Sequence, residues 1–197
     1  MIEKTLKGWK CTPEDFEKSV KWFTLDELTR SNYFDAACEA GINPMPDGYA
    51  IERLRQLCMY VLDPLRERWG APILINSGYR CEWINVKVGG VKNSQHAKGE
   101  AADIRCQSKK DRDIRYGNRR LLGLILFSDL CFDQVIAENC DENGYPEWIH
   151  ISLKPNDGNR NQFLVKKRPT PAPSPARPEG TLDSSRREGR GEKKQIQ

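Results

Sequence analysis

Apolar residues recur every three or four positions from Tyr49 to Trp69, which predicts a long helix with one buried stripe. Gly70 ends this pattern, and Pro64 within it predicts a kink. A second long helix is expected over about residues 108–127, where leucine and isoleucine supply an apolar side. The two helices predict a substantial helical layer.

Shorter helices are expected nearer the N-terminus. Thr24 and Glu27 have the spacing of a capping box, which predicts a short helix to about residue 30. A further short helix is expected over about residues 32–40, with Gly41 as a left-handed cap, and another turn or two over about residues 81–88. For residues 1–22 the mixed pattern supports no structural prediction.

Short apolar runs bounded by turn residues predict the strands. We expect them at Ile73–Asn76, Ala101–Ile104, Phe132–Glu138 and Trp148–Leu153. The last two are separated by a short polar loop, so they are expected to pair antiparallel. The fold class is therefore α+β, with helices packed on a small, mostly antiparallel sheet.

The pattern changes at residue 166. The segment 166–197 contains five of the twelve prolines and almost no large apolar residue, so we expect a disordered tail after a domain formed by residues 1–165. Nine basic and four acidic residues lie in this tail, which leaves the domain close to neutral. A nucleic-acid-binding domain would carry its basic excess on the folded part, so nucleic acid is not an expected partner.

The seven cysteines are an odd number and form no C-x-x-C pair, which argues against a cysteine zinc module and a secreted disulfide framework. No apolar run is long enough for a signal peptide core or a membrane span. We therefore expect reduced thiols and a chain made in the cytoplasm without membrane insertion, and a monomer.

Both histidines of the chain lie close to carboxylates. His96 begins a segment that reaches Asp103, and His150 follows Glu147 by three residues. Catalytic zinc takes three protein ligands and leaves the fourth position to water. His96, Asp103 and His150 supply such a set, and they are the predicted ligands of Zn²⁺. The alternative is that each histidine is an ordinary core or surface residue and binds no metal.

Two further residues complete a hydrolytic site. Glu147 is the candidate general base, and Arg80 is the candidate stabiliser of negative charge on a carbonyl oxygen under attack. In a regular strand Glu147 and His150 would point to opposite faces. We expect Pro146 to delay regular pairing until Trp148, which would free Glu147 to turn inward.

Three polar residues near these positions are candidates for substrate binding: Ser77, Tyr79 and Ser94. A structural role is at least as plausible for Ser77 and Tyr79. Ser94 is expected chiefly to shape the backbone before His96.

The combined motif Ser94-x-His96-x-x-Gly99-x-Ala101-x-Asp103 with Glu147-x-x-His150 resembles the zinc D-alanyl-D-alanine carboxypeptidases and dipeptidases, which share their fold with the Hedgehog signalling domain. The similarity covers roughly residues 23–153 and includes the segments INSGYR and FDQVIAE. It places the family's zinc ligands on the same two histidines and aspartate, its acid/base carboxylate on Glu147 and its stabilising arginine on Arg80.

The resemblance implies a zinc peptidase that acts on peptides of bacterial peptidoglycan, as a carboxypeptidase or an endopeptidase, and the absent signal peptide suits a phage lysis enzyme. The alternative is a non-catalytic module that keeps a metal for stability and binds the cell wall or forms part of a phage particle.

Overall fold

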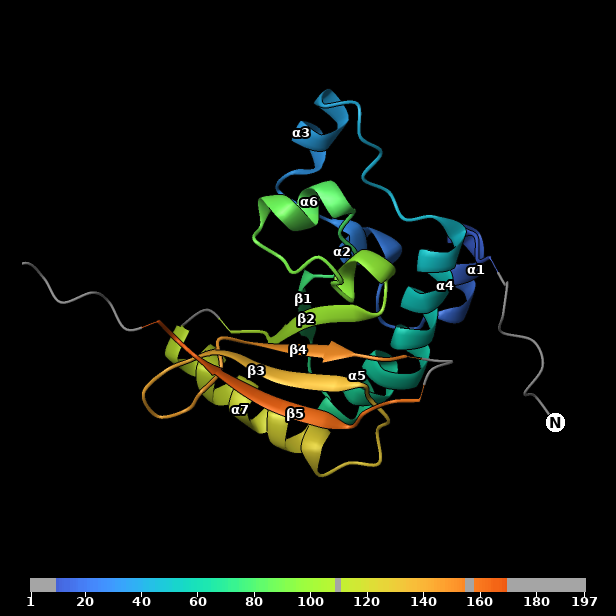
Figure 1. The fold of residues 1–197 in the computed structure, drawn as a ribbon. Helices are drawn as coiled ribbons and strands as arrows, with labels where there is room; N and C mark the ends of the chain where they lie inside the picture. The colour runs from blue at the N-terminus through green and yellow to red at the C-terminus, as the bar shows by residue number, and fades with distance from the viewer. Residues whose placement is uncertain (1–9, 109–110, 155–157, 170–197) are drawn as a thin grey trace, which may run out of the picture.

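The computed structural model describes residues 10–108, 111–154 and 158–169. Its five-stranded sheet has the order β1-β2-β4-β3-β5 (Figure 1), formed by β1 (Ile73–Ser77), β2 (Ala101–Cys106), β4 (Trp148–Ser152), β3 (Gln134–Cys140) and β5 (Gln162–Lys167). The first four strands pair antiparallel, and β5 pairs parallel to β3. The predicted α+β class with a mostly antiparallel sheet is confirmed.

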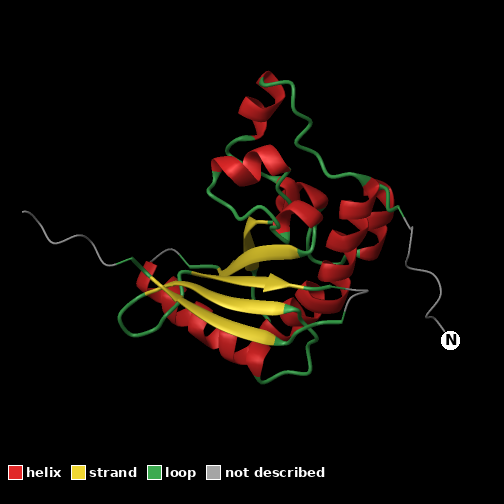
Figure 2. Cartoon of the chain, in the orientation of Figure 1, coloured by secondary structure: helices red, strands yellow, loops and turns green. Residues whose placement is uncertain are grey.

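Helices surround this sheet on several sides (Figure 2). They are α1 (Pro13–Ser19), α2 (Leu25–Thr29), α3 (Phe34–Glu39), α4 (Gly48–Leu57), α5 (Asp63–Trp69), α6 (Glu82–Lys87) and α7 (Asp111–Leu126). The capping box of Thr24 and Glu27 begins α2 as predicted, and Gly41 follows α3 with a φ of 73°. Helix α1 was not predicted, although Thr12 and Asp15 form a capping box with Pro13 at the first helical position.

The long helix predicted over residues 49–69 is present but not uniform. A π-helical turn, Cys58–Leu62, joins α4 to α5, and Pro64 lies just beyond it at the start of α5. The helix is thus irregular near Pro64 as predicted, but the irregularity is a π-helical turn that precedes the proline. Gly70 ends the helix in the left-handed conformation, with a φ of 68°.

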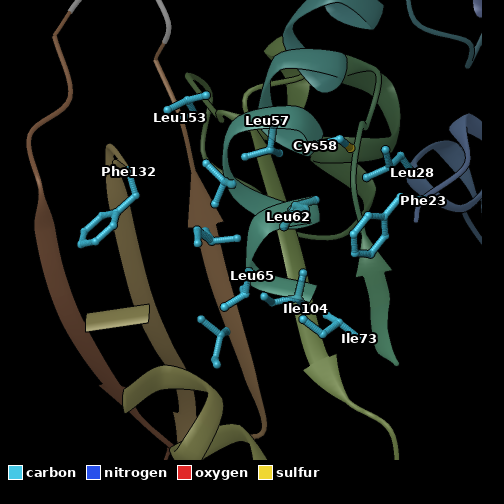
Figure 3. Packing of buried hydrophobic residues seen from close by; sticks show 14 of the residues in the cluster. Phe23, Leu28, Leu57, Cys58, Leu62, Leu65, Ile73, Ile104, Phe132 and Leu153 are labelled. Atoms are coloured by element: carbon cyan, nitrogen blue, oxygen red, sulfur yellow. The ribbon is translucent and has the colours of Figure 1, made fainter. Parts of the chain in front are cut away.

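The core lies between this long helix, α7 and one face of the sheet. Leu57, Leu62 and Leu65 project from the helix toward β2 and β4 (Figure 3), and all three are fully buried. They pack in one cluster with alternate strand residues, which include Ile104, Ile149 and Ile151. The opposite side chains of β2 and β4, including Asp103 and His150, therefore face away from this core.

The sheet extends further along the chain than predicted. Lys166 and Lys167 belong to β5, so the expected boundary at residue 165 falls inside a strand. The lack of strong apolar alternation hid β5, because it is an edge strand whose side chains are largely exposed. Residues 170–197, where the rest of the tail was predicted, lie outside the described residues.

All seven cysteines lie within the described residues, and each is a free thiol. In the same part of the chain no helix has both the length and the apolar character needed to cross a bilayer.

Candidate metal centre and cleft

His96, Asp103 and His150 come from three separate elements and meet at one point. Asp103 in β2 lies directly opposite His150 in β4. His96 begins a single turn of 3-10 helix, His96–Lys98, in the loop before β2. One ligand atom from each of the three residues lies within 4.8 Å of the others. The tertiary structure thus assembles the group that the two sequence segments suggested.

The donor atoms are closely spaced. Nδ1 of His150 lies 3.0 Å from Oδ1 of Asp103 and 3.1 Å from Nε2 of His96. The same Nε2 lies 3.3 Å from Oδ1 of Asp103. Ligands bound to zinc at 2.0–2.1 Å in tetrahedral geometry are roughly 3.3 Å apart. Two nitrogens and one oxygen at this spacing fit a single zinc-sized ion with a fourth position left open.

The ring of His96 is oriented by the backbone. Its Nδ1 lies 2.7 Å from the carbonyl oxygen of Gly78, to which it donates, so Nε2 is left to face Asp103. Gly78 can occupy this position because it has no side chain: a Cβ there would collide with the backbone of Leu28 in α2. A glycine is needed for the same reason at Gly99, which has a φ of 75° and lies against the backbone of Ala50 in α4.

The charges of the site support one another. Burial by itself raises the pKa of the Asp103 carboxyl, but the charge of His96 and hydrogen bonds from both histidines outweigh it, so the pKa lies well below its ordinary value. Asp103 is therefore held as a carboxylate, the form that binds a cation. Arg80 lies on its other side, with Nη2 3.8 Å from Oδ2.

Arg80 is only 17% exposed, and its Nε has no hydrogen-bond partner among the described residues. Burial lowers the pKa of its guanidinium, while Asp103 opposes that effect. The group stays charged because an arginine pKa is so high. Arg80 is therefore a partly desolvated cation that lies beside the predicted ligand Asp103, near the metal as expected from the sequence.

A cavity of about 650 Å³ opens over these residues. It lies on the sheet face opposite the core and is lined by strand residues of matching parity, Gln134, Ile136, Glu138, Trp148 and His150. His96, Asp103 and Arg80 form another part of its lining. The three donor atoms are thus accessible from a cavity large enough for a short peptide.

The structure does not bring Glu147 to this cavity. Strand β4 begins at Trp148, and the amide of Glu147 just before it donates to the carbonyl oxygen of Glu138 at 3.0 Å. Its side chain contacts Arg115, with Oε2 2.8 Å from Nη2, and also Asn139. The expectation that regular pairing begins at Trp148, after Pro146, is thus confirmed, but Glu147 does not turn toward the cavity.

Asn118 in α7 holds the backbone just before β4 in place. It is fully buried, and its amide donates to the carbonyl oxygens of Pro146 at 3.2 Å and Glu147 at 2.6 Å. Its oxygen accepts from the amide of Cys106 at 2.8 Å. Sequence reasoning missed Asn118, whose only signal is a polar residue among the apolar positions of α7.

Glu138 is the glutamate that lines the cavity. It lies opposite Trp148 in β4 and is therefore a diagonal neighbour of His150 on the same face, where such neighbours are about 7–8 Å apart. Its side chain is 15% exposed and accepts a hydrogen bond from Lys166 of β5 at 2.8 Å. The sequence shows only that Glu138 shares a face of the predicted strand FDQVIAE with Gln134, and the pairing register decides that this face meets the site.

The three substrate-binding candidates have different positions. Ser94 lines the cavity, and its Oγ accepts from the amide of His96 at 3.3 Å, as expected of a residue that shapes the loop. Ser77 pairs with Asp103 at the end of β1, and Tyr79 packs against both hydrophobic clusters. Neither of these two is part of the cavity lining.

Comparison with known proteins bears on the first part of the chain. A family model described as peptidase M15 matches residues 21–121, a span that includes Arg80, His96 and Asp103. A search of curated proteins found none that matches the chain.

Proposed function

The chain belongs to peptidase family M15, a family of metallopeptidases, and on that premise we propose that it is a zinc-dependent peptidase that hydrolyses peptide bonds of bacterial peptidoglycan. The proposed zinc ligands are His96, Asp103 and His150. The bond would be one of the D-alanyl-D-alanine type, cut by a carboxypeptidase or an endopeptidase, and a phage lysis enzyme is the proposed setting.

One observation carries this proposal: a His-Asp-His group with one open side lies at the floor of a peptide-sized cavity. Zinc bound there would supply polarisation of the carbonyl under attack and a lower pKa for water. A purely structural zinc site is closed by a fourth protein ligand. The described residues offer three such ligands, which favours catalysis over a structural metal.

The residues around the ligands have separate roles in the proposed reaction. Glu138 accepts a proton from the attacking water on its side-chain carboxylate and later gives it to the leaving amine. Arg80 stabilises the negative charge that develops on the carbonyl oxygen. Glu147 was the base expected from the sequence, and its contacts with Arg115 and Asn139 support an orienting role for the loop before β4 instead.

The second candidate function is a metal-stabilised module that binds the cell wall without cutting it. The ion pair between Glu138 and Lys166 is the observation that favours it, because a carboxylate engaged by a lysine is less available to a water molecule. The two functions differ in whether the protein releases peptides.

Digestion of purified peptidoglycan, followed by mass analysis of what is released, tests the proposal. The full-length protein with zinc is expected to release peptides, and the masses identify the bond. A chelator should abolish release, and zinc should restore it. Binding to peptidoglycan without any release of peptides would reject the enzyme and support the wall-binding module.

A further inference from the structure

A buried carboxylate that takes no part in the proposed reaction lies at one end of the cavity. Asp133 precedes β3 and is fully buried. Its oxygens accept from Nε and Nη2 of Arg160 at 2.9 and 2.5 Å, and from Nε2 of Gln95 at 2.8 Å. Nζ of Lys154 lies 3.7 Å from the same carboxylate. Asp133 therefore holds two cations in place beside the loop that carries His96.

Burial alone would raise the pKa of Asp133, but the hydrogen bonds from Arg160 and Gln95 hold it at about 2. The carboxylate is therefore charged at neutral pH. One carboxylate balances only one of its two cationic partners, Arg160 and Lys154. Both of these line the cavity, with side chains 47% and 28% exposed.

The whole cavity has an excess of positive charge. Five basic residues line it, Arg80, Lys98, Lys154, Arg160 and Lys166, against two acidic ones, Asp103 and Glu138. Asp103 is paired with Arg80, and Glu138 with Lys166. The uncompensated charge therefore includes the end where Lys154 and Arg160 share Asp133. An anion entering the cavity would meet there the ammonium group of Lys154 and the side of the Arg160 guanidinium that Asp133 does not use.

This end lies at a defined distance from the proposed ligands. The amide of Asp133 donates to the carbonyl oxygen of Ser152, which is two residues beyond His150 along β4. Two residues of a strand span about 7 Å, and two residues of an extended peptide substrate span nearly the same length. A group bound by Lys154 and Arg160 would therefore lie about two residues from the bond that is cut.

We propose that Lys154 and Arg160, held by Asp133, form an anion subsite that binds a carboxylate of the peptide substrate about two residues from the cleaved bond. This inference rests on the proposed function, since it places the carboxylate relative to that reaction. Both cations lie outside the span matched by the family model, between the end of β4 and the start of β5.

The carboxylate could belong to the end of the peptide or to an acidic side chain. A synthetic stem peptide of peptidoglycan distinguishes them when it is prepared in three forms: with all carboxylates free, with the terminal carboxylate amidated, and with the side-chain carboxylate amidated. Binding of each form is measured by calorimetry on the full-length, zinc-loaded protein carrying Glu138→Gln, so that the peptide stays intact.

The free form is expected to bind roughly tenfold or more tightly than one of the two amidated forms, as a charge-assisted hydrogen bond predicts. Adding Lys154→Gln or Arg160→Gln should remove that preference while leaving the binding of the amidated form unchanged. Lys167→Gln is the matched control, because Lys167 neighbours Lys166 in β5 but does not line the cavity. It should preserve the preference.

Equal binding of all three forms would overturn the subsite, as would a loss of affinity that is the same for every form. Arg160→Gln removes the main partner of the buried Asp133. If that variant does not fold, Lys154→Gln alone decides the question. Hydrolysis of the free peptide by the unmodified protein is measured separately. Its absence would reject the proposed function, whereas the binding preference still decides the subsite.

Discussion

The side-chain amide of Asn118 donates to the carbonyl oxygen of Glu147 at 2.6 Å and thereby fixes the backbone at the start of β4. With the backbone held at this point, Glu147 contacts Arg115, whereas Glu138 lines the cavity. This one contact from α7 thus bears on which of two glutamates is the proposed proton acceptor.

The two glutamates give a matched pair of substitutions. Glu138→Gln is expected to keep the fold and the metal but to lower kcat by about 10²–10⁴-fold, the usual contribution of a general base. Glu147→Gln should leave kcat nearly unchanged, because its carboxylate contacts Arg115 and Asn139. Steady-state kinetics on one soluble peptide measure both. The reverse ranking would return the role to Glu147.

Removal of a proposed ligand should be visible without any assay of activity. His150→Ala removes one of three donors and is expected to weaken zinc binding by more than the roughly 10–100-fold typical for loss of a ligand's hydrogen-bond partner. Competition with a chromophoric chelator measures the affinity. Glu138→Gln serves as the control, since it changes the cavity but none of the donors. Equal zinc affinity in the two variants would exclude His150 as a ligand.

Arg80 is expected to act in the transition state. Arg80→Lys keeps a positive charge but loses the planar guanidinium, and kcat should fall by about 10²–10³-fold, as it does when an oxyanion donor is removed. The KM should change much less, and zinc content not at all. A rise in KM with an unchanged kcat would instead assign Arg80 to binding of the substrate.

Asn118→Ala should destabilise the fold by about 1–3 kcal/mol, because it removes hydrogen bonds to one main-chain amide and two main-chain carbonyl groups. Chemical denaturation measures the free energy of unfolding. Asn32→Ala, at an exposed position, is the control and should have little effect. If both variants unfold at the same denaturant concentration, Asn118 does not fix the start of β4.

The stability contributed by Asp133 should depend on acid pH. The pKa of this carboxyl is about 2 in the folded protein, below its ordinary 3.8, so the unfolded chain binds more protons between these values. Its contribution is complete above about pH 4 and is lost as the pH falls through 2. The difference in melting temperature between the unmodified protein and Asp133→Asn should therefore shrink below pH 4. A constant difference would contradict the assignment.

Local patterns were enough to locate most elements. The spacing of apolar residues predicted the long helix, and capping residues such as Thr24 and Gly41 marked the ends of short ones, because these signals act within a few residues. The irregular turn before Pro64 and the edge strand β5 were less accessible, since neither leaves a strong apolar period.

The sequence by itself determined which chemical groups are available: two histidines, each close to a carboxylate, and an arginine in the turn after β1. Tertiary structure decided which of them meet. Strand pairing brings Asp103 opposite His150 and places Glu138 at the cavity, with β5 beside it. A hydrogen bond from Asn118 fixes the backbone at Glu147. The physical reason is that the face on which a strand side chain lies depends on the pairing register and on contacts from distant elements, and neighbouring residues in the sequence do not determine either of these.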